Sequence, residues 1–172
     1  MAAGTSHRWD RGMRRRLVRG EEAALGELYD RLAPTVHRLA HRVLEDDRAA
    51  DGVTREVFAH VWQHPEEFDP GRGTLRSWMA GLASERAVRR LREDGGASEE
   101  RIRGAATAAR ADFIVTSMPS SLREALESAY RRRRTYRETA RELDVTQDEA
   151  RRRLRLGLQL LSSAGGPAGG TR

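Results

Sequence analysis

Apolar residues recur along most of the chain at the spacing that puts them on one face of an α-helix. The first such stripe contains Leu25, Leu28, Tyr29 and Leu32, which fit the i, i+3, i+4, i+7 rule. No stretch alternates apolar and polar residues with a period of two, so no strand is predicted. The pattern therefore predicts an all-α protein built from short amphipathic helices.

Prolines and capping residues mark the ends of four helices predicted in the first part of the chain. Pro34 fits the first turn of a second helix, where its missing N–H costs little. Asp46 can cap a third helix, which Pro65 would end. Residues 64–73 have the composition of a loop, and Thr74 can cap the fourth helix.

Two capping boxes predict helix starts in the last part of the chain. Ser121 with Glu124, and Thr135 with Glu138, each place a hydroxyl three residues before a carboxylate. The hydroxyl can accept a hydrogen bond from a free N–H of the first turn, and the carboxylate can reach back to the N–H of the capping residue. Each pair therefore predicts the first turn of a helix.

A third capping box, Thr146 with Glu149, predicts another helix start close behind the second. Residues 143–145 between these two helices are about the length of the turn in a helix-turn-helix. The apolar positions that would bury one stripe of this motif are Leu143, Val145, Ala150, Leu154, Leu158 and Leu161.

Changes in composition divide the chain into five segments. Residues 1–20 are polar and predicted to be a frayed tail, and residues 21–92 hold the first helical domain. Residues 93–111 are rich in glycine, alanine and charge, which is typical of a flexible linker. The helix-turn-helix domain is predicted over residues 112–161, and residues 162–172 form a disordered tail.

The charge balance favours a polyanionic partner. Among the 172 residues 38% are hydrophobic and 34% charged, and the formal net charge is +6. All 32 basic residues are arginine, whose guanidinium binds phosphates and guanine edges with two hydrogen bonds at once. The second helix of the predicted helix-turn-helix carries Gln147, Arg151, Arg152 and Arg155 on one face, which suits a DNA major groove. A solvated hairpin with a charged outer face is the simpler alternative.

Other kinds of chemistry have little support in the sequence. The chain has no cysteine, no glycine-rich phosphate loop and no nucleophile elbow, so no enzyme and no cofactor is predicted. The pairs His37 with His41 and His60 with His64 could in principle hold a metal, but surface histidines are the better interpretation. Without a long apolar run or a signal peptide, the protein is expected to be cytoplasmic.

The order and spacing of several motifs resemble a known family. In the first domain these are LYDRLAPTVHRLAHRVL, VTREVFAHVW and FDPGRGTLRSWMAGLASERAVRRLR. In the second they are LREALESAY, TYRETARELDV and RRRLRLGL. From about residue 21 to residue 161, the chain is similar to bacterial RNA polymerase sigma factors of the extracytoplasmic-function group.

The resemblance implies a division of labour between the two domains. The first would bind core RNA polymerase and open the promoter at its minus-ten element, and the second would read the minus-thirty-five element. An anti-sigma factor would be a further partner, as such proteins often have one. The polymerase-binding positions implied are Asp51, Arg55, Glu56 and Phe58.

The resemblance also implies two sets of DNA-binding residues. Phe68 would offer a stacking face to an extruded base, and Arg72 a phosphate partner. Trp78 shares its spacing with Leu75 and Leu82, which favours the core. The promoter-opening set is Phe68, Arg72, Arg76, Trp78, Arg86 and Arg90. The recognition-helix set is Thr146, Gln147, Arg151, Arg152, Arg153 and Arg155.

The chain departs from the family pattern at several positions. The residues of this chain, each followed by the residue that is usual in the family, are Gly52 in place of an acid, Arg55 in place of glutamine, Glu85 in place of asparagine, residues 132–134 in place of Gly-Gly-Leu, Thr139 in place of isoleucine and Asp144 in place of glycine. Two alternatives therefore stay open. One is a degenerate sigma-like regulator that binds polymerase, DNA or another protein without initiating transcription. The other is a helical interaction module with a merely solubilising basic face, whose DNA binding would respond weakly to salt.

Overall fold

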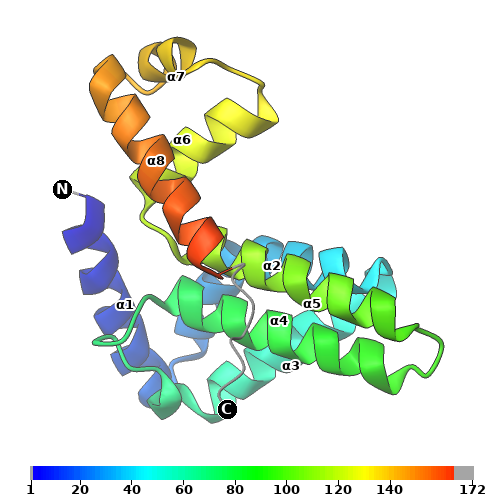
Figure 1. Cartoon of the computed structure of the whole chain (residues 1–172). Coiled ribbons are helices and arrows are strands. Elements are labelled where there is room, and N and C mark those ends of the chain that lie inside the picture. Colours follow the sequence, from blue (N-terminus) through cyan, green and yellow to red (C-terminus); the bar gives the residue numbers. More distant parts are fainter. Residues whose placement is uncertain (1, 165–172) are drawn as a thin grey trace, which may run out of the picture. The chain divides into compact units, whose positions relative to one another are not determined.

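A computed structural model describes residues 2–164 of the chain, and the side chains of residues 7–162. This part of the chain is helical and contains no strand, which confirms the predicted all-α class (Figure 1). The helices form two compact units, Met1–Phe113 and Ile114–Arg172, which we describe separately.

The first unit is built around three helices. Helix α2 (Glu22–Leu44) packs against both α3 (Asp47–Gln63) and α4 (Leu75–Glu93), and a short 3₁₀ helix, η1 (Pro65–Glu67), follows α3. The predicted caps are present, since the Asp46 carboxylate accepts from the Ala49 N–H and the Thr74 hydroxyl accepts from the Ser77 N–H. The largest fully buried side chains of these helices are Leu28, Val36, Leu39, Val53, Val57, Val61, Leu75 and Met79.

Pro34 does not begin a helix but lies inside α2, so that prediction is wrong. Proline in a helix interior removes one hydrogen bond and costs about 3 kcal/mol. The residues on either side of it, Leu28 and Leu32 before and Val36 and Leu39 after, are all buried in the same core. Burial of this continuous stripe offsets the cost, because each such side chain contributes about 1.5–3 kcal/mol.

The predicted N-terminal tail is also helical. Residues Ala2–Val18 form α1, and Met13 and Leu17 of this helix are buried in the core of the first unit. Arg14 of α1 donates from Nε to the carbonyl oxygen of Phe68 over 2.8 Å. Helix α1 therefore holds the loop between η1 and α4, which is part of the region predicted to open the promoter.

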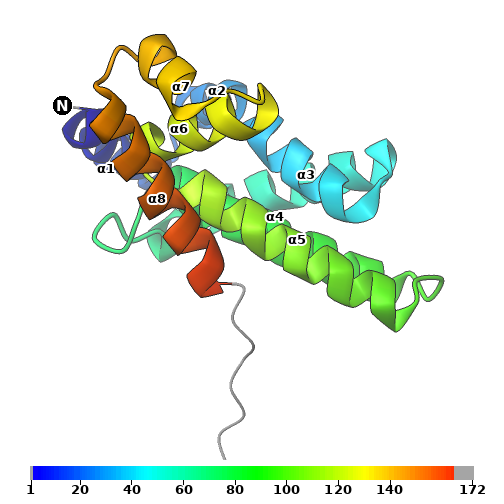
Figure 2. The ribbon, with the colours of Figure 1, turned by 45° about the horizontal axis from the view of Figure 1, so that its top comes forward.

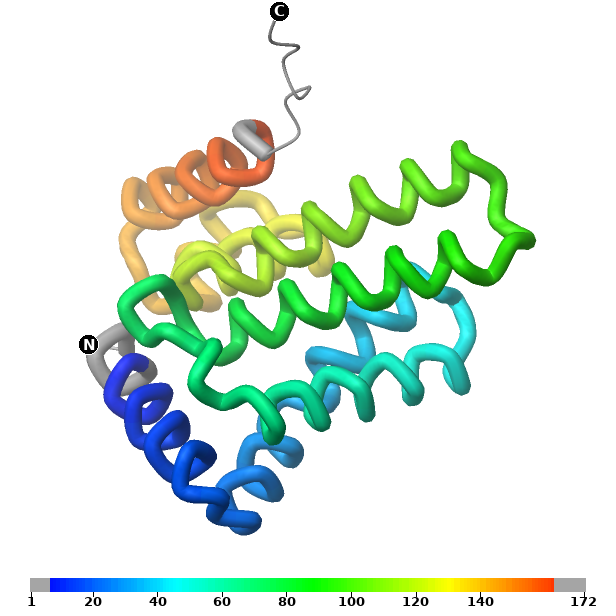
Figure 3. The backbone as a smooth tube through the Cα atoms, turned by 90° about the horizontal axis from the view of Figure 1, so that it is seen from below, coloured from blue at the N-terminus to red at the C-terminus, as the bar shows by residue number. Residues whose placement is uncertain are grey.

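The predicted linker forms a helix as well. Residues Glu99–Ser117 are α5, whose first part lies alongside α4 (Figures 2 and 3). Ile102 and Ala109 are buried in the core of the first unit, and Asp112 forms an ion pair with Arg42 of α2 over 2.8 Å. Alanine is the best helix former, so the alanines that suggested a flexible linker in fact favour a helix.

Asp10 of α1 is buried at the start of α4. Its carboxylate accepts a hydrogen bond from the Leu75 backbone N–H, while its Oδ2 atom is buried without a partner among the described residues. Burial raises the pKa of Asp10, and the Leu75 N–H only partly opposes this. The stability that protonated Asp10 contributes is complete below the ordinary aspartate pKa and is lost as the pH rises through the raised value.

We therefore expect Asp10→Asn to stabilise the first unit at neutral pH and to flatten its loss of stability between mildly acidic and neutral pH. All three tryptophans lie in this unit, so urea unfolding followed by tryptophan fluorescence reports on it alone. Asp30→Asn, at an exposed site on α2, is the matched control. Destabilisation by Asp10→Asn at neutral pH would show instead that the ionised carboxylate stabilises the start of α4.

The second unit is a small three-helix assembly in which α6 (Ser120–Arg131) and α8 (Gln147–Ala164) pack together, and α7 (Tyr136–Glu142) joins them (Figure 2). The Thr135–Glu138 capping box is present at the start of α7, as predicted. The Ser121–Glu124 box is not, because α6 already begins after Pro119 and has no side-chain cap. Residues 162–164 continue α8, and the rest of the predicted C-terminal tail lies outside the described residues.

The buried face of α8 is rotated from the predicted stripe. Ala150 and Gly157 are buried, whereas Leu158, predicted to be buried, is 42% exposed. A Cβ atom on Gly157 would lie 2.8 Å from Cδ1 of Leu126 on α6, so the two helices cross at this glycine. The face that meets α6 is therefore defined by Gly157, a residue without a side chain that a hydrophobic pattern cannot mark.

Both turns of the second unit contain a non-glycine residue in the left-handed region. Arg133, between α6 and α7, has φ of 49°, and Asp144, between α7 and α8, has φ of 50°. Asp144 stands where the family resemblance implies glycine, and Arg133 lies in the segment that replaces Gly-Gly-Leu. The backbone of each turn thus adopts a conformation in which glycine would be unstrained.

Candidate nucleic-acid interface

Helix α8 carries the predicted recognition set on its first turns. Thr146 precedes the helix and accepts from the N–H of Glu149 over 3.2 Å, and Gln147 is exposed at its first position. Arg151, Arg152 and Arg155 are exposed, and Arg153 is half-buried. The structure therefore places all six residues at one end of the second unit.

The arginines of α8 do not all carry free charge, because Glu149 binds two of them. Its carboxylate accepts from Arg153 Nε over 2.7 Å and from Arg152 NH2 over 2.6 Å. The hydrogen bond from Arg153, followed by that from Arg152, lowers the pKa of Glu149. The Thr146–Glu149 capping box is consequently only half formed, because the Glu149 carboxylate accepts from the two arginines and not from the Thr146 N–H.

Arg151 is held differently, by an aromatic residue of the preceding helix. Its guanidinium lies 4.1 Å from the ring centroid of Tyr136 and donates to the Tyr136 hydroxyl over 2.6 Å. Arg137 Nε donates to the same oxygen over 3.3 Å. The hydrogen bond from Arg137, followed by that from Arg151, lowers the pKa of Tyr136. Sequence reasoning missed Tyr136, although the Thr135 cap already fixed it as the first residue of α7.

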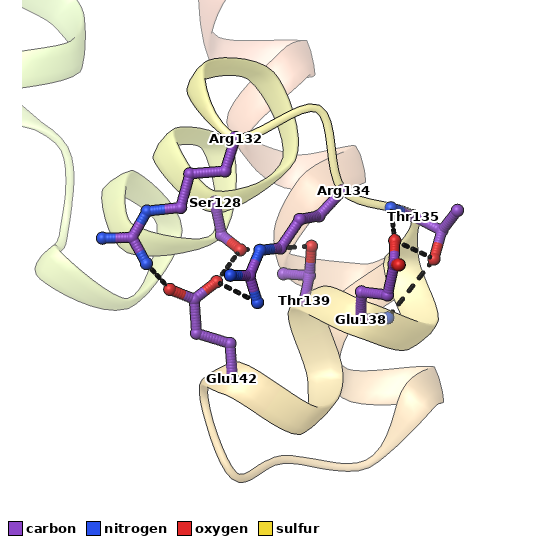
Figure 4. A network of polar contacts seen from close by, with 7 residues as sticks. All are labelled: Ser128, Arg132, Arg134, Thr135, Glu138, Thr139 and Glu142. Atoms are coloured by element: carbon purple, nitrogen blue, oxygen red, sulfur yellow. Dashed lines mark hydrogen bonds and ion pairs between the residues drawn. The ribbon is translucent and has the colours of Figure 1, made fainter.

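A polar network supports the helix-turn-helix from within (Figure 4). Glu142 binds Arg132 and, over 3.4 Å, Arg134, and it also accepts from the Ser128 hydroxyl. The Ser128 oxygen in turn accepts from the fully buried hydroxyl of Thr139 over 3.5 Å, because the one Ser128 hydrogen is donated to Glu142. The arginine-rich turn and the buried threonine, both departures from the family pattern, are thus joined through Glu142 and Ser128.

The loop before α4 borders a pocket of about 440 Å³ in the first unit. Phe68 lines it but is only 2% exposed, so its ring cannot stack on a base in this structure, contrary to the prediction. Trp78 is half-buried and lies against Phe68, with ring centroids 5.6 Å apart. Arg72 is exposed at the pocket rim, and Glu85 adds a carboxylate. The partly exposed aromatic side chains of this pocket are therefore Trp78, whose ring rests on Phe68, and Phe113.

The predicted cations of α4 differ in their surroundings. Arg76 and Arg86 are half-buried, whereas Arg90 is exposed and forms an ion pair with Glu56 of α3 over 3.3 Å. The guanidinium of Arg90 lies over Gly52, where an added Cβ atom would be 2.6 Å from NH1. Gly52 thus leaves room for the contact between Arg90 and Glu56, which are predicted to belong to separate binding surfaces.

The predicted polymerase-binding residues lie on α3, but one of them is not at the surface. Asp51, Arg55 and Glu56 are exposed. Phe58 is only 5% exposed and packs against Tyr29 of α2, with ring centroids 4.8 Å apart. Phe58 therefore belongs to the core, whereas the other three predicted positions are exposed to a partner.

The histidine pairs each lie beside carboxylates. His37 is 3.2 Å from Asp51, and His60 is 2.7 Å from Glu67. Among the described residues, no group of three histidine, aspartate or glutamate side chains is arranged to hold a metal ion. Within the same part of the chain, no helix combines the length and apolar character needed to cross a membrane.

Residues 28–96, which span most of α2 and all of α3 and α4, match the sigma-70 region 2 family. The chain is 28% identical over 165 residues to the ECF RNA polymerase sigma factor SigK of Mycobacterium tuberculosis strain H37Rv, covering 86% of this chain and 88% of that protein. SigK of Mycobacterium ulcerans is 28% identical over 163 residues, covering 84% and 87%.

A solved structure of CnrH in complex with the cytosolic domain of CnrY is also similar. It is 18% identical, covers 90% of this chain and 95% of that one, and has a TM-score of 0.43. Residues 28–96 therefore belong to the sigma-70 region 2 family. The relatives support an extracytoplasmic-function sigma factor over most of the chain, in agreement with its motifs.

Proposed function

We propose that this protein is a non-enzymatic subunit that binds core RNA polymerase and directs promoter recognition and transcription initiation. The observation that carries the proposal is the sigma-70 region 2 match over residues 28–96, followed in the second unit by a helix-turn-helix with an arginine-bearing second helix. Asp51, Arg55 and Glu56 on α3 would form the polymerase contact. The exposed acids and the arginine among them suit a polar interface.

Promoter opening would take place at the pocket before α4. An extruded base needs an aromatic face and a cation for its phosphate, and Trp78 and Arg72 supply them at one opening. Phe68 and Arg14 act on this site indirectly, since Phe68 supports the Trp78 ring and Arg14 holds the Phe68 backbone. The second unit would bind the minus-thirty-five element through the exposed arginines of α8.

Transcription in vitro with core polymerase tests this function. Promoter-dependent transcripts from genomic fragments are the expected result. Binding to core polymerase without any transcript would support the sigma-like regulator instead, and absence of core binding would refute the proposal. The anti-sigma partner that the family resemblance implies stays a prediction, which co-purification from cells would test.

Trp78→Ala should impair opening of a duplex promoter but not transcription from a template that is already unpaired. Loss of base stacking costs about 1–3 kcal/mol, which corresponds to a roughly 5- to 150-fold fall in open complexes. Permanganate footprinting of unpaired thymines measures this step. Trp78→Phe is the control, because it retains an aromatic ring. An equal loss on duplex and unpaired templates would show that Trp78 acts only in folding or in polymerase binding.

A further inference from the structure

We infer that Tyr136, Arg137 and Arg151 form a binding site for a phosphodiester group of the DNA backbone. In this arrangement the Arg151 guanidinium binds a phosphate of the DNA backbone and does not contact a base edge. The inference rests on the proposed promoter binding and specifies what one part of the helix-turn-helix does there. We call these three residues the tyrosine cluster.

The tyrosine cluster brings two cations to one neutral oxygen. Arg151 NH2 lies 2.6 Å and Arg137 Nε 3.3 Å from the Tyr136 hydroxyl oxygen. The acids nearby compensate little of this charge. Asp148 of α8 lies 3.8 Å from Arg151 and its side chain is 95% exposed, and Glu138 of α7 is bound to Thr135.

The hydrogen bonds within the cluster leave donors for an anion. Tyr136 accepts from two guanidiniums, so its own O–H remains available to donate. Each guanidinium has five N–H donors in a planar fork, most of which are not used by Tyr136. Stacking on the ring fixes the plane of the Arg151 guanidinium. A phosphodiester, with two charged oxygens, can accept from several such donors at once.

The position of the cluster favours the DNA backbone over a base edge. Tyr136 and Arg137 belong to α7, the helix that crosses the backbone when a helix-turn-helix docks in the major groove. Because its guanidinium is held against Tyr136, Arg151 is tied to α7 although it belongs to α8. Arg155 of α8 is also exposed and is not held by a residue of α7 in this way.

The neighbouring Arg152 provides a contrast on the same helix. Two of its nitrogens donate to Glu149, so most of its charge is already compensated within the protein. Neutralising a DNA phosphate releases counterions, and each such contact contributes about 0.9 to the slope of log affinity against log salt. Arg151 and Arg137 should therefore contribute more to this slope than Arg152.

The test is equilibrium binding of the full chain to a promoter fragment and to a scrambled duplex over a series of salt concentrations. Arg151→Ala and Arg137→Ala should each weaken binding to both duplexes alike and lower the salt slope by about 1. The ratio of promoter to scrambled affinity should stay unchanged, because phosphate contacts carry no sequence information. Arg152→Ala should change the slope less.

Two conservative variants separate binding from folding. Tyr136→Phe keeps the ring under Arg151 but removes the hydroxyl, so it should weaken binding to both duplexes with little change in slope. Arg151→Lys keeps the charge and should retain most of the slope while losing affinity, since lysine lacks the planar fork.

The inference fails if Arg151→Ala abolishes the preference for the promoter, because Arg151 would then read a base. It also fails if Arg151→Ala and Arg152→Ala lower the salt slope equally. Binding to core polymerase, measured on the same variants, should be unchanged. If the wild-type chain does not bind core polymerase at all, the proposed function fails, but the salt slopes still decide whether the tyrosine cluster binds phosphate.

Discussion

Replacement of Glu142 by alanine is expected to unfold the second unit while the first stays intact. Glu142 is 20% exposed and binds the buried Ser128 and the exposed Arg132 and Arg134, so its loss leaves the buried Ser128 hydroxyl without its charged acceptor and removes both ion pairs. Hydrogen bonds to a charged group contribute about 1.5–3 kcal/mol. The apolar core of this unit is small, so a loss of this size is a large part of its stability.

Hydrogen–deuterium exchange measured by mass spectrometry distinguishes the two units within one chain. Peptides from α6, α7 and α8 should exchange much faster in Glu142→Ala, whereas peptides from α2, α3 and α4 should not change. Glu127→Ala is the control, because it removes an exposed carboxylate of α6. Unchanged exchange in Glu142→Ala would mean that apolar contacts alone hold the helix-turn-helix and that the network in Figure 4 is incidental.

Gly157→Leu is expected to separate α6 from α8 and to abolish specific DNA binding. Even a Cβ atom at this position would lie 2.8 Å from Cδ1 and 3.0 Å from Cγ of Leu126. Overpacking of this kind costs about 1–3 kcal/mol, and a full leucine side chain adds more strain than a methyl group. Gly157→Ala should have a much smaller effect, because the end of Leu126 can move and alanine gains about 1 kcal/mol of helix propensity.

A second substitution tests whether the clash with Leu126 is the cause. Leu126→Ala removes the atoms that leucine at position 157 would meet, so the double variant should regain part of the lost stability and DNA affinity. Coupling between residues in contact is typically about 0.5–3 kcal/mol. Strictly additive losses in the double variant would contradict a direct contact. Gly104→Ala, where nothing lies within 4 Å, serves as the control and should be neutral or slightly stabilising.

Local signals in the sequence located most helix boundaries. The caps at Asp46, Thr74 and Thr135 are where the sequence placed them, since capping depends on residues only three apart. Tertiary packing overrode the local signals elsewhere. Pro34 stays inside α2 because the same core buries the helix on both sides of it, and Met13 lies in a buried helix despite its arginine-rich neighbours.

The arginines of the candidate interface could be located from the sequence, but their partners could not. Arg152 pairs with Glu149 within one helical turn, a contact that spacing allows but does not require. Arg151 instead stacks on a tyrosine of another helix, which depends on how α7 meets α8. The role given to Phe68 failed for a similar reason, since composition marks an aromatic residue in a loop but not whether its ring points inward.

The left-handed residues at Arg133 and Asp144 have a consequence for finding distant members of this family. At both turns the backbone adopts dihedral angles that glycine reaches without strain, although the residues there are an arginine and an aspartate. A search pattern that demands glycine at these turns would overlook such a chain, although both residues adopt the left-handed conformation that glycine favours. A comparison of backbone dihedral angles at these turns would detect such a relative where a comparison of residue types fails.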